Sequence, residues 1–93
     1  MDVTWRLFAT LGEAAGDDDL TVSVPADATV ADAVAALFDA YPAVAAEARA
    51  PDGTVYDHVR TLHEGDDIDD PLESDRPVAA GDELALFPPV SGG

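Results

Sequence analysis

The 93-residue chain contains neither cysteine nor lysine. Without cysteine it can form no disulfide bond, no thiolate nucleophile and no zinc site built from cysteine ligands. Without lysine, its cationic side chains other than two histidines are four arginines. These stand against twenty aspartates and glutamates and leave a formal net charge of −16. The sequence is therefore strongly acidic, and its side chains offer no primary amine.

The scarcity of positive charge excludes several kinds of partner. Binding to a nucleic-acid backbone requires clustered cations that release counterions, whereas Arg6, Arg49, Arg60 and Arg76 are scattered among acidic residues. We therefore expect no nucleic-acid partner and, for the same electrostatic reason, no anionic membrane surface. Self-repulsion at this charge also predicts a monomer when the protein is free.

The composition indicates a salt-rich setting. Self-repulsion destabilises a compact domain in dilute buffer, but at about 1 M salt the screening length falls to roughly 3 Å. The Asp-rich, Lys-free composition resembles that of proteins from extreme halophiles. Residues 1–15 carry no basic segment followed by an apolar run, and no stretch approaches the ~20 apolar residues of a membrane span. We therefore expect a soluble, cytoplasmic protein.

Large apolar side chains are few, but they suffice for one domain. A chain of this length buries roughly 60 to 65% of the surface of its unfolded form, so one modest core is expected. The residues that could form it are Val3, Trp5, Leu7, Val22, Val24, Val30, Val34, Leu37, Tyr41, Val59, Leu62, Leu84 and Leu86.

Two strands open the chain. Residues 3–10 alternate, with Val3, Trp5 and Leu7 on one face and mostly polar residues on the other, where Phe8 is the exception. Residues 20–24 alternate again. A hairpin is expected, with a short turn at residues 11–15 in its connection.

A helix follows. Thr29 and Asp32 have the spacing of an N-terminal capping pair, and Pro42 should end the helix because proline disfavours helical geometry in the residue before it. A second short helix over residues 43–49 can start from that proline. The apolar stripe of the first helix is Val30, Val34, Leu37, Phe38 and Tyr41.

Two more strands are expected, over residues 55–64 and 83–87, separated by an irregular acidic segment at 66–77. The order strand, strand, helix, strand, strand predicts an α+β domain with the helix on one sheet face. If the first and last strands are neighbours, Phe8 and Phe87 lie together on the open face. Apolar residues on a polar sheet face usually need a covering, so this pair is a candidate contact for a partner. The alternative is that the two rings pack together only for stability.

The domain is expected to span residues 1–88, followed by a flexible tail at 89–93. The adjacent prolines favour an extended exit from the last strand. Gly92 and Gly93 lack Cβ atoms, so this end of the backbone can thread a narrow channel and present an unhindered carbonyl. A bare Gly-Gly end is weak evidence, but strand, proline exit and two glycines in succession are more specific.

These features resemble a known family. The opening residues 5–9 with Gly12-Glu13, the helix entry at 27–32 and the closing run 81–93 are similar to the β-grasp, ubiquitin-like proteins of the molybdopterin synthase small-subunit and sulfur-carrier type. The resemblance is strongest to the small archaeal modifier proteins of haloarchaea. It implies a β-grasp fold with a mixed four- to five-stranded sheet packed on one main helix.

The resemblance also implies a chemistry. An adenylating activating enzyme would use ATP and magnesium to form an acyl adenylate on Gly93, with Gly92 supplying clearance. The product would then become a thiocarboxylate, which donates sulfur to molybdopterin synthesis or tRNA thiolation, or an isopeptide with substrate lysines. Phe8 and Phe87, joined by Ile68, would contact the activating enzyme or the large subunit of molybdopterin synthase. The protein itself would be no enzyme, with no catalytic residues and no bound cofactor.

Two rival functions remain open at this stage. One is a dedicated small subunit of molybdopterin synthase that acts only as a sulfur donor. The other is a β-grasp binding module with an inert tail.

No metal site is expected. The acidic run at residues 66–70 lacks the glycine and distal glutamate of a calcium loop and is best interpreted as solvated. His58 and His63 would point to opposite faces of one strand, so a surface or partly packed histidine is the better interpretation of each. Ser91 has no evident base beside it and is expected to act as a small spacer.

Overall fold

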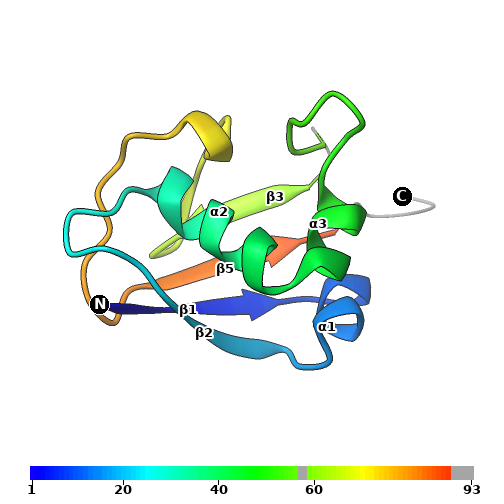
Figure 1. The fold of residues 1–93 in the computed structure, drawn as a ribbon, viewed down its shortest axis with the longest axis horizontal. Helices are drawn as coiled ribbons and strands as arrows, with labels where there is room; N and C mark the ends of the chain where they lie inside the picture. Colours follow the sequence, from blue (N-terminus) through cyan, green and yellow to red (C-terminus); the bar gives the residue numbers. More distant parts are fainter. Residues whose placement is uncertain (57–58, 89–93) are drawn as a thin grey trace.

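The computed structural model describes residues 1–56 and 59–88. Its five strands form one sheet in the order β2-β1-β5-β3-β4, with β1 parallel to β5 at the centre and the other pairs antiparallel. The helices cover one face (Figure 1). The strands are β1 (Asp2–Leu7), β2 (Asp19–Ser23), β3 (Arg60–His63), β4 (Asp66–Asp67) and β5 (Glu83–Phe87); the helices are α1 (Thr10–Ala15), α2 (Val30–Ala40), α3 (Pro42–Ala48) and the 3-10 turn η1 (Pro71–Glu73). The predicted α+β class, with its mixed sheet on one main helix, is confirmed.

The core lies between the sheet and α2. Trp5 on β1 pairs in register with Leu84 on β5, and both side chains are fully buried. The Trp5 indole Nε1 donates a hydrogen bond to the carbonyl of Ala33 in α2 at 3.2 Å, which satisfies the one polar atom of that buried side chain. The alternation of β1 and β5 thus fixes which sheet face the helix covers.

Two residues expected in the core lie at its margin. Tyr41, which follows the last residue of α2, is half-buried. Leu62 is also half-buried, because its neighbours Thr61 and His63 take the core-facing positions of β3. Leu62 therefore points to the open face of the sheet, and its placement in the core was wrong.

The connection between β1 and β2 is a helix, not the expected turn. Residues 10–15 form α1, whose buried Leu11 closes one end of the core. Ala9 starts the helix from an uncommon backbone conformation with φ 52°, and Gly16 ends it with φ 84°. Six residues are too few to display the helical periodicity that distinguishes a helix from a turn in sequence.

The main helix begins and ends where the sequence predicts. The Thr29 hydroxyl accepts from the Asp32 backbone N–H, and the Asp32 carboxylate accepts from the Thr29 N–H in a complete capping box. Pro42 stands at the first position of α3. Both helix boundaries follow from local residue chemistry.

The second half of the chain is less regular than expected. Among the described residues of the predicted strand over 55–64, Arg60–His63 form β3, and Val55 makes an isolated bridge with Arg49. The acidic segment contains β4 and η1 and is tied to α2 by the Val30 N–H, which donates to the Arg76 carbonyl at 2.8 Å. Within residues 1–56 and 59–88, no helix is long and apolar enough to cross a membrane.

Candidate functional site

Phe8 and Phe87 stack on the open face of the sheet, as predicted. Their ring centroids are 4.2 Å apart with an interplanar angle of 14°. Phe8 is 37% exposed, more than any other large apolar residue that the structure describes, and Phe87 is half-buried. The pair presents an apolar surface at the point where β5 ends.

The backbone around Ala9 sets the position of Phe8. The Phe8 N–H donates to the Leu86 carbonyl at 3.3 Å, which extends the pairing of β1 with β5 by one residue. The positive φ of Ala9 then turns the chain into α1, which lies at the end of the sheet where β1 and β5 finish (Figure 1). The turn leaves Phe8 on the open face and carries Leu11 to the core.

Leu62 and Ala85 extend the apolar surface across the sheet. They are opposite each other in the β3–β5 register, and together with the two phenylalanines they line a hollow of about 340 Å³. We call Phe8, Leu62, Ala85 and Phe87 the aromatic patch. Sequence reasoning missed Leu62, although its alternation with Thr61 and His63 carried the signal.

Charged side chains at the rim of the aromatic patch are already paired. Arg6 lies 3.3 Å from a carboxylate oxygen of Asp19 and 3.4 Å from one of Glu83. Glu64 accepts a hydrogen bond from the Glu83 backbone N–H at 2.7 Å. The chemistry that the patch offers to a partner is therefore apolar contact.

Gly92 and Gly93, the predicted reacting end, lie outside the described residues, as does the predicted tail at 89–93. The structure describes the chain up to Pro88, directly after the aromatic patch. The roles of Gly92 and Gly93 stay predictions.

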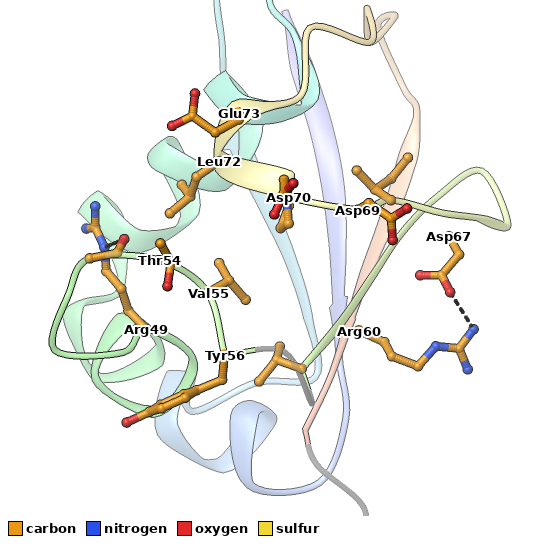
Figure 2. A pocket seen from close by; sticks show the side chains of 14 residues that line it. Arg49, Thr54, Val55, Tyr56, Arg60, Asp67, Asp69, Asp70, Leu72 and Glu73 are labelled. Atoms are coloured by element: carbon orange, nitrogen blue, oxygen red, sulfur yellow. Dashed lines mark hydrogen bonds and ion pairs between the residues drawn. The ribbon is translucent and has the colours of Figure 1, made fainter.

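Ile68 lies apart from the aromatic patch. Its backbone N–H donates to the Thr61 carbonyl at 2.8 Å, and its half-buried side chain packs against the core. It lines a second, larger hollow of about 710 Å³, between the loop that follows α3 and the segment 67–73 (Figure 2). We call this hollow the side groove. The two hollows share none of the described residues that line them, so a partner contact of Ile68 remains a prediction for a different surface.

His63 is buried, in place of the surface or partly packed position that the sequence suggested. Only 6% of its side chain is exposed, and its Nε2 lies 2.7 Å from a carboxylate oxygen of Asp82. The same oxygen accepts from the Ala79 backbone N–H at 2.8 Å. The Ala79 N–H, and secondarily the His63 ring, hold the pKa of Asp82 below its ordinary value. The pair fastens β3 to the turn before β5.

The acidic segment is partly neutralised by arginines. Arg76 hydrogen-bonds to Asp66 at 2.6 Å and thereby lowers the pKa of that carboxyl group. Arg60 lies 3.3 Å from Asp67. Across residues 1–56 and 59–88 no three metal-ligating side chains gather at one point, while His58 lies outside the described residues.

Comparisons with known proteins identify the family. The curated Small archaeal modifier protein 1 of Haloferax volcanii is 48% identical over 89 residues, which cover 96% of this chain and 98% of that protein. Small archaeal modifier protein 3 of the same organism is 34% identical over an alignment of 96 positions, which covers both chains completely. The crystal structure of SAMP1 from Haloferax volcanii matches with a TM-score of 0.89 and 46% identity over the full length of both chains, which confirms the β-grasp fold. The model of the ThiS family matches residues 5–93, and the chain belongs to this family.

Proposed function

We propose that this protein is a ubiquitin-like modifier and sulfur carrier that acts through the carboxylate of Gly93. The observation that carries the proposal is the 48% identity to Small archaeal modifier protein 1 along nearly the whole chain. Membership of the ThiS family and the match to the SAMP1 crystal structure support the same role. Within this role the protein is a carrier and not an enzyme.

The chemistry begins with activation of the C-terminus. A carboxylate oxygen of Gly93 attacks the α-phosphorus of ATP, pyrophosphate leaves, and an acyl adenylate forms. An activating enzyme supplies ATP, magnesium and every catalytic group. Displacement of AMP by hydrosulfide gives a thiocarboxylate, and displacement by a lysine amine of a substrate protein gives an isopeptide bond. Gly92 keeps the reacting carbonyl unhindered.

We expect the aromatic patch to help the activating enzyme hold the protein. Five residues separate Pro88 from the end of the chain and can extend ~17 Å at most. A protein that encloses the Gly93 carboxylate must therefore come close to Phe87 and Phe8. Because the rim charges are paired within the protein, we expect the enzyme to contribute apolar side chains to this contact.

An adenylation assay tests the proposal. The protein is incubated with the adenylating enzyme of its own organism, ATP and magnesium, and ATP–pyrophosphate exchange is measured in concentrated KCl. We expect exchange with the full chain and none after deletion of Gly92 and Gly93, while circular dichroism shows the same fold for both. Equal exchange for the two proteins contradicts the proposed role of the tail.

The product of the reaction separates the modifier from a dedicated small subunit of molybdopterin synthase. The modifier forms isopeptides with lysine-bearing proteins, whereas a dedicated subunit forms the thiocarboxylate alone. A folded protein that yields neither product with an active adenylating enzyme would be a binding module with an inert tail.

A further inference from the structure

The side groove is built between two walls that internal bonds hold in place. On one wall, the Ala50 N–H donates to the Thr54 carbonyl at 2.7 Å, and the Asp52 carboxylate accepts from both the N–H and the hydroxyl of Thr54. On the other wall, Ile68 is bonded to β3 through its N–H. A hollow of about 710 Å³ with such walls lies within the usual size range of ligand pockets, roughly 300 to 1,000 Å³.

The floor of the side groove is apolar. The half-buried residues of this floor are Val55, Ile68 and Leu72, which pack against the core. Val59 and Pro71 are buried. Figure 2 shows Leu72, Thr54 and Val55 turned toward the same space. These aliphatic side chains give the side groove an apolar floor beneath polar and charged walls.

Arg49 is the charge that distinguishes this groove. The other arginines each lie within 3.4 Å of a carboxylate, but Arg49 makes no ion pair with any residue that the structure describes. Its Nε donates to the Gly53 carbonyl at 2.8 Å, and its guanidinium carbon lies 5.9 Å from the centroid of the Phe38 ring. These contacts orient the guanidinium and leave its two terminal nitrogens for a carboxylate.

The charged residues of the side groove lie on different sides of it. Asp69, Asp70 and Glu73 line the wall formed by residues 67–73, and within the described chain their carboxylates have no hydrogen bond or ion pair. Arg49 lies on the side opposite the Arg60–Asp67 pair (Figure 2). Among the described residues, an occupant therefore meets a cation without an ion pair at one side and carboxylates without a partner along the other wall.

We propose that the side groove docks an extended peptide segment of a second protein. The segment places an apolar side chain on Ile68 and Leu72, a carboxylate on Arg49, and a cationic side chain toward Asp69 and Asp70. This inference goes beyond the proposed activation of Gly93. Because the groove shares no residue with the aromatic patch, such a partner can bind while the patch is covered.

Peptide selection tests the inference. A phage-displayed library of random linear peptides is selected on the wild-type protein in concentrated KCl, after depletion on Arg49→Glu. The best peptide is synthesised, and its Kd is measured by fluorescence polarisation. We expect enriched peptides that combine an apolar residue with an acidic residue on one side and a basic residue on the other. Arg49→Glu and Ile68→Asp should each weaken binding at least about tenfold.

Matched controls separate docking in the groove from other effects. Arg6→Glu makes the same charge change on the open face of the sheet, and Phe87→Ala removes one ring of the aromatic patch; both variants should bind the peptide as the wild type does. Arg49→Glu should regain affinity for a peptide whose acidic residue is replaced by arginine. Circular dichroism verifies the fold of each variant. Failure to enrich any peptide, a loss of binding with Arg6→Glu or Phe87→Ala equal to that with Arg49→Glu, or absence of the charge-swap rescue would overturn the inference.

Discussion

At the scale of single residues, the buried side chain of His63 is stabilised by one specific hydrogen-bond partner. His63 is enclosed by the core, and Asp82 supplies the partner of its Nε2 at 2.7 Å. The pKa of Asp82 lies below its ordinary value because the Ala79 N–H and the His63 ring stabilise the carboxylate. A depressed carboxyl pKa adds stability that is complete above the pKa of the unfolded chain and is lost as the pH falls through the folded value.

Asp82→Asn should therefore change the pH dependence of stability. At neutral pH we expect the variant to have a lower free energy of unfolding than the wild type, because a neutral amide is a weaker acceptor for the two donors. The difference between the free energies of unfolding of the two proteins should narrow as the pH falls below about 4. Urea denaturation of both proteins across this range measures it; because the other carboxyl groups are common to both, a gap that does not depend on pH would contradict the assignment.

Phe87→Ala should separate docking from folding. The ring is half-buried on the open face of the sheet, so its loss should leave the fold intact while KM in the adenylation assay rises at least about tenfold. Thr21→Ala, on the exposed side of the edge strand β2, is the matched control and should leave KM unchanged. Unfolding of Phe87→Ala would instead assign the stacked pair to stability.

The sequence predicted single residues unevenly. Phe8 and Phe87 were placed correctly because strand alternation depends only on local geometry. His63 was not, because its burial depends on Asp82, nineteen residues away in the chain. Leu62 was also misplaced, although the alternation of residues 61–63 was visible in the sequence. Burial of a polar residue costs less free energy where a partner satisfies it, and the local pattern around His63 contains no information about a partner so distant in the chain.

At the scale of elements, the boundaries of α2 followed from chemistry within a few residues. The capping box of Thr29 and Asp32 and the proline at position 42 were all visible in the sequence. By contrast, α1, β4 and η1 are short, and their form depends on tertiary contacts such as the bond between Ile68 and Thr61. Short elements of this kind were the part of the fold that sequence patterns could not predict.

Removal of the cap should cost a defined amount of stability. Thr29→Ala leaves the Asp32 N–H without its hydroxyl acceptor, and we expect a loss of about 1 kcal/mol in the free energy of unfolding. Ser23→Ala, exposed at the end of β2, should change it by less than about 0.5 kcal/mol. Urea denaturation of the three proteins in the same KCl concentration makes the comparison, and equal stability of Thr29→Ala and the wild type would contradict the role of the cap.

At the scale of the whole molecule, the net charge of −16 governs stability in solution. The free energy of unfolding should rise with KCl concentration, because screening weakens repulsion among surface carboxylates. The double variant Asp69→Asn with Glu73→Gln removes two negative charges that have no partner among the described residues. Its free energy of unfolding should therefore depend less on KCl concentration than that of the wild type. Denaturation midpoints across a KCl series measure how strongly the stability of each protein depends on salt. A stronger dependence for the variant would exclude repulsion among carboxylates as the cause of the salt effect.

In the proposed function, the folded domain is recognised while the carboxylate of Gly93 is loaded or transferred. Mass spectrometry of the protein from its native cells tests this claim most directly. Because Pro77 follows Arg76, trypsin leaves a long branch on a modified lysine, whereas cleavage after Glu83 leaves residues 84–93. We predict this branch on lysines of other proteins, together with free protein in which one oxygen at Gly93 is exchanged for sulfur. Cells that contain the adenylating enzyme and the folded protein, but neither the branch nor the thiocarboxylate, would contradict the account.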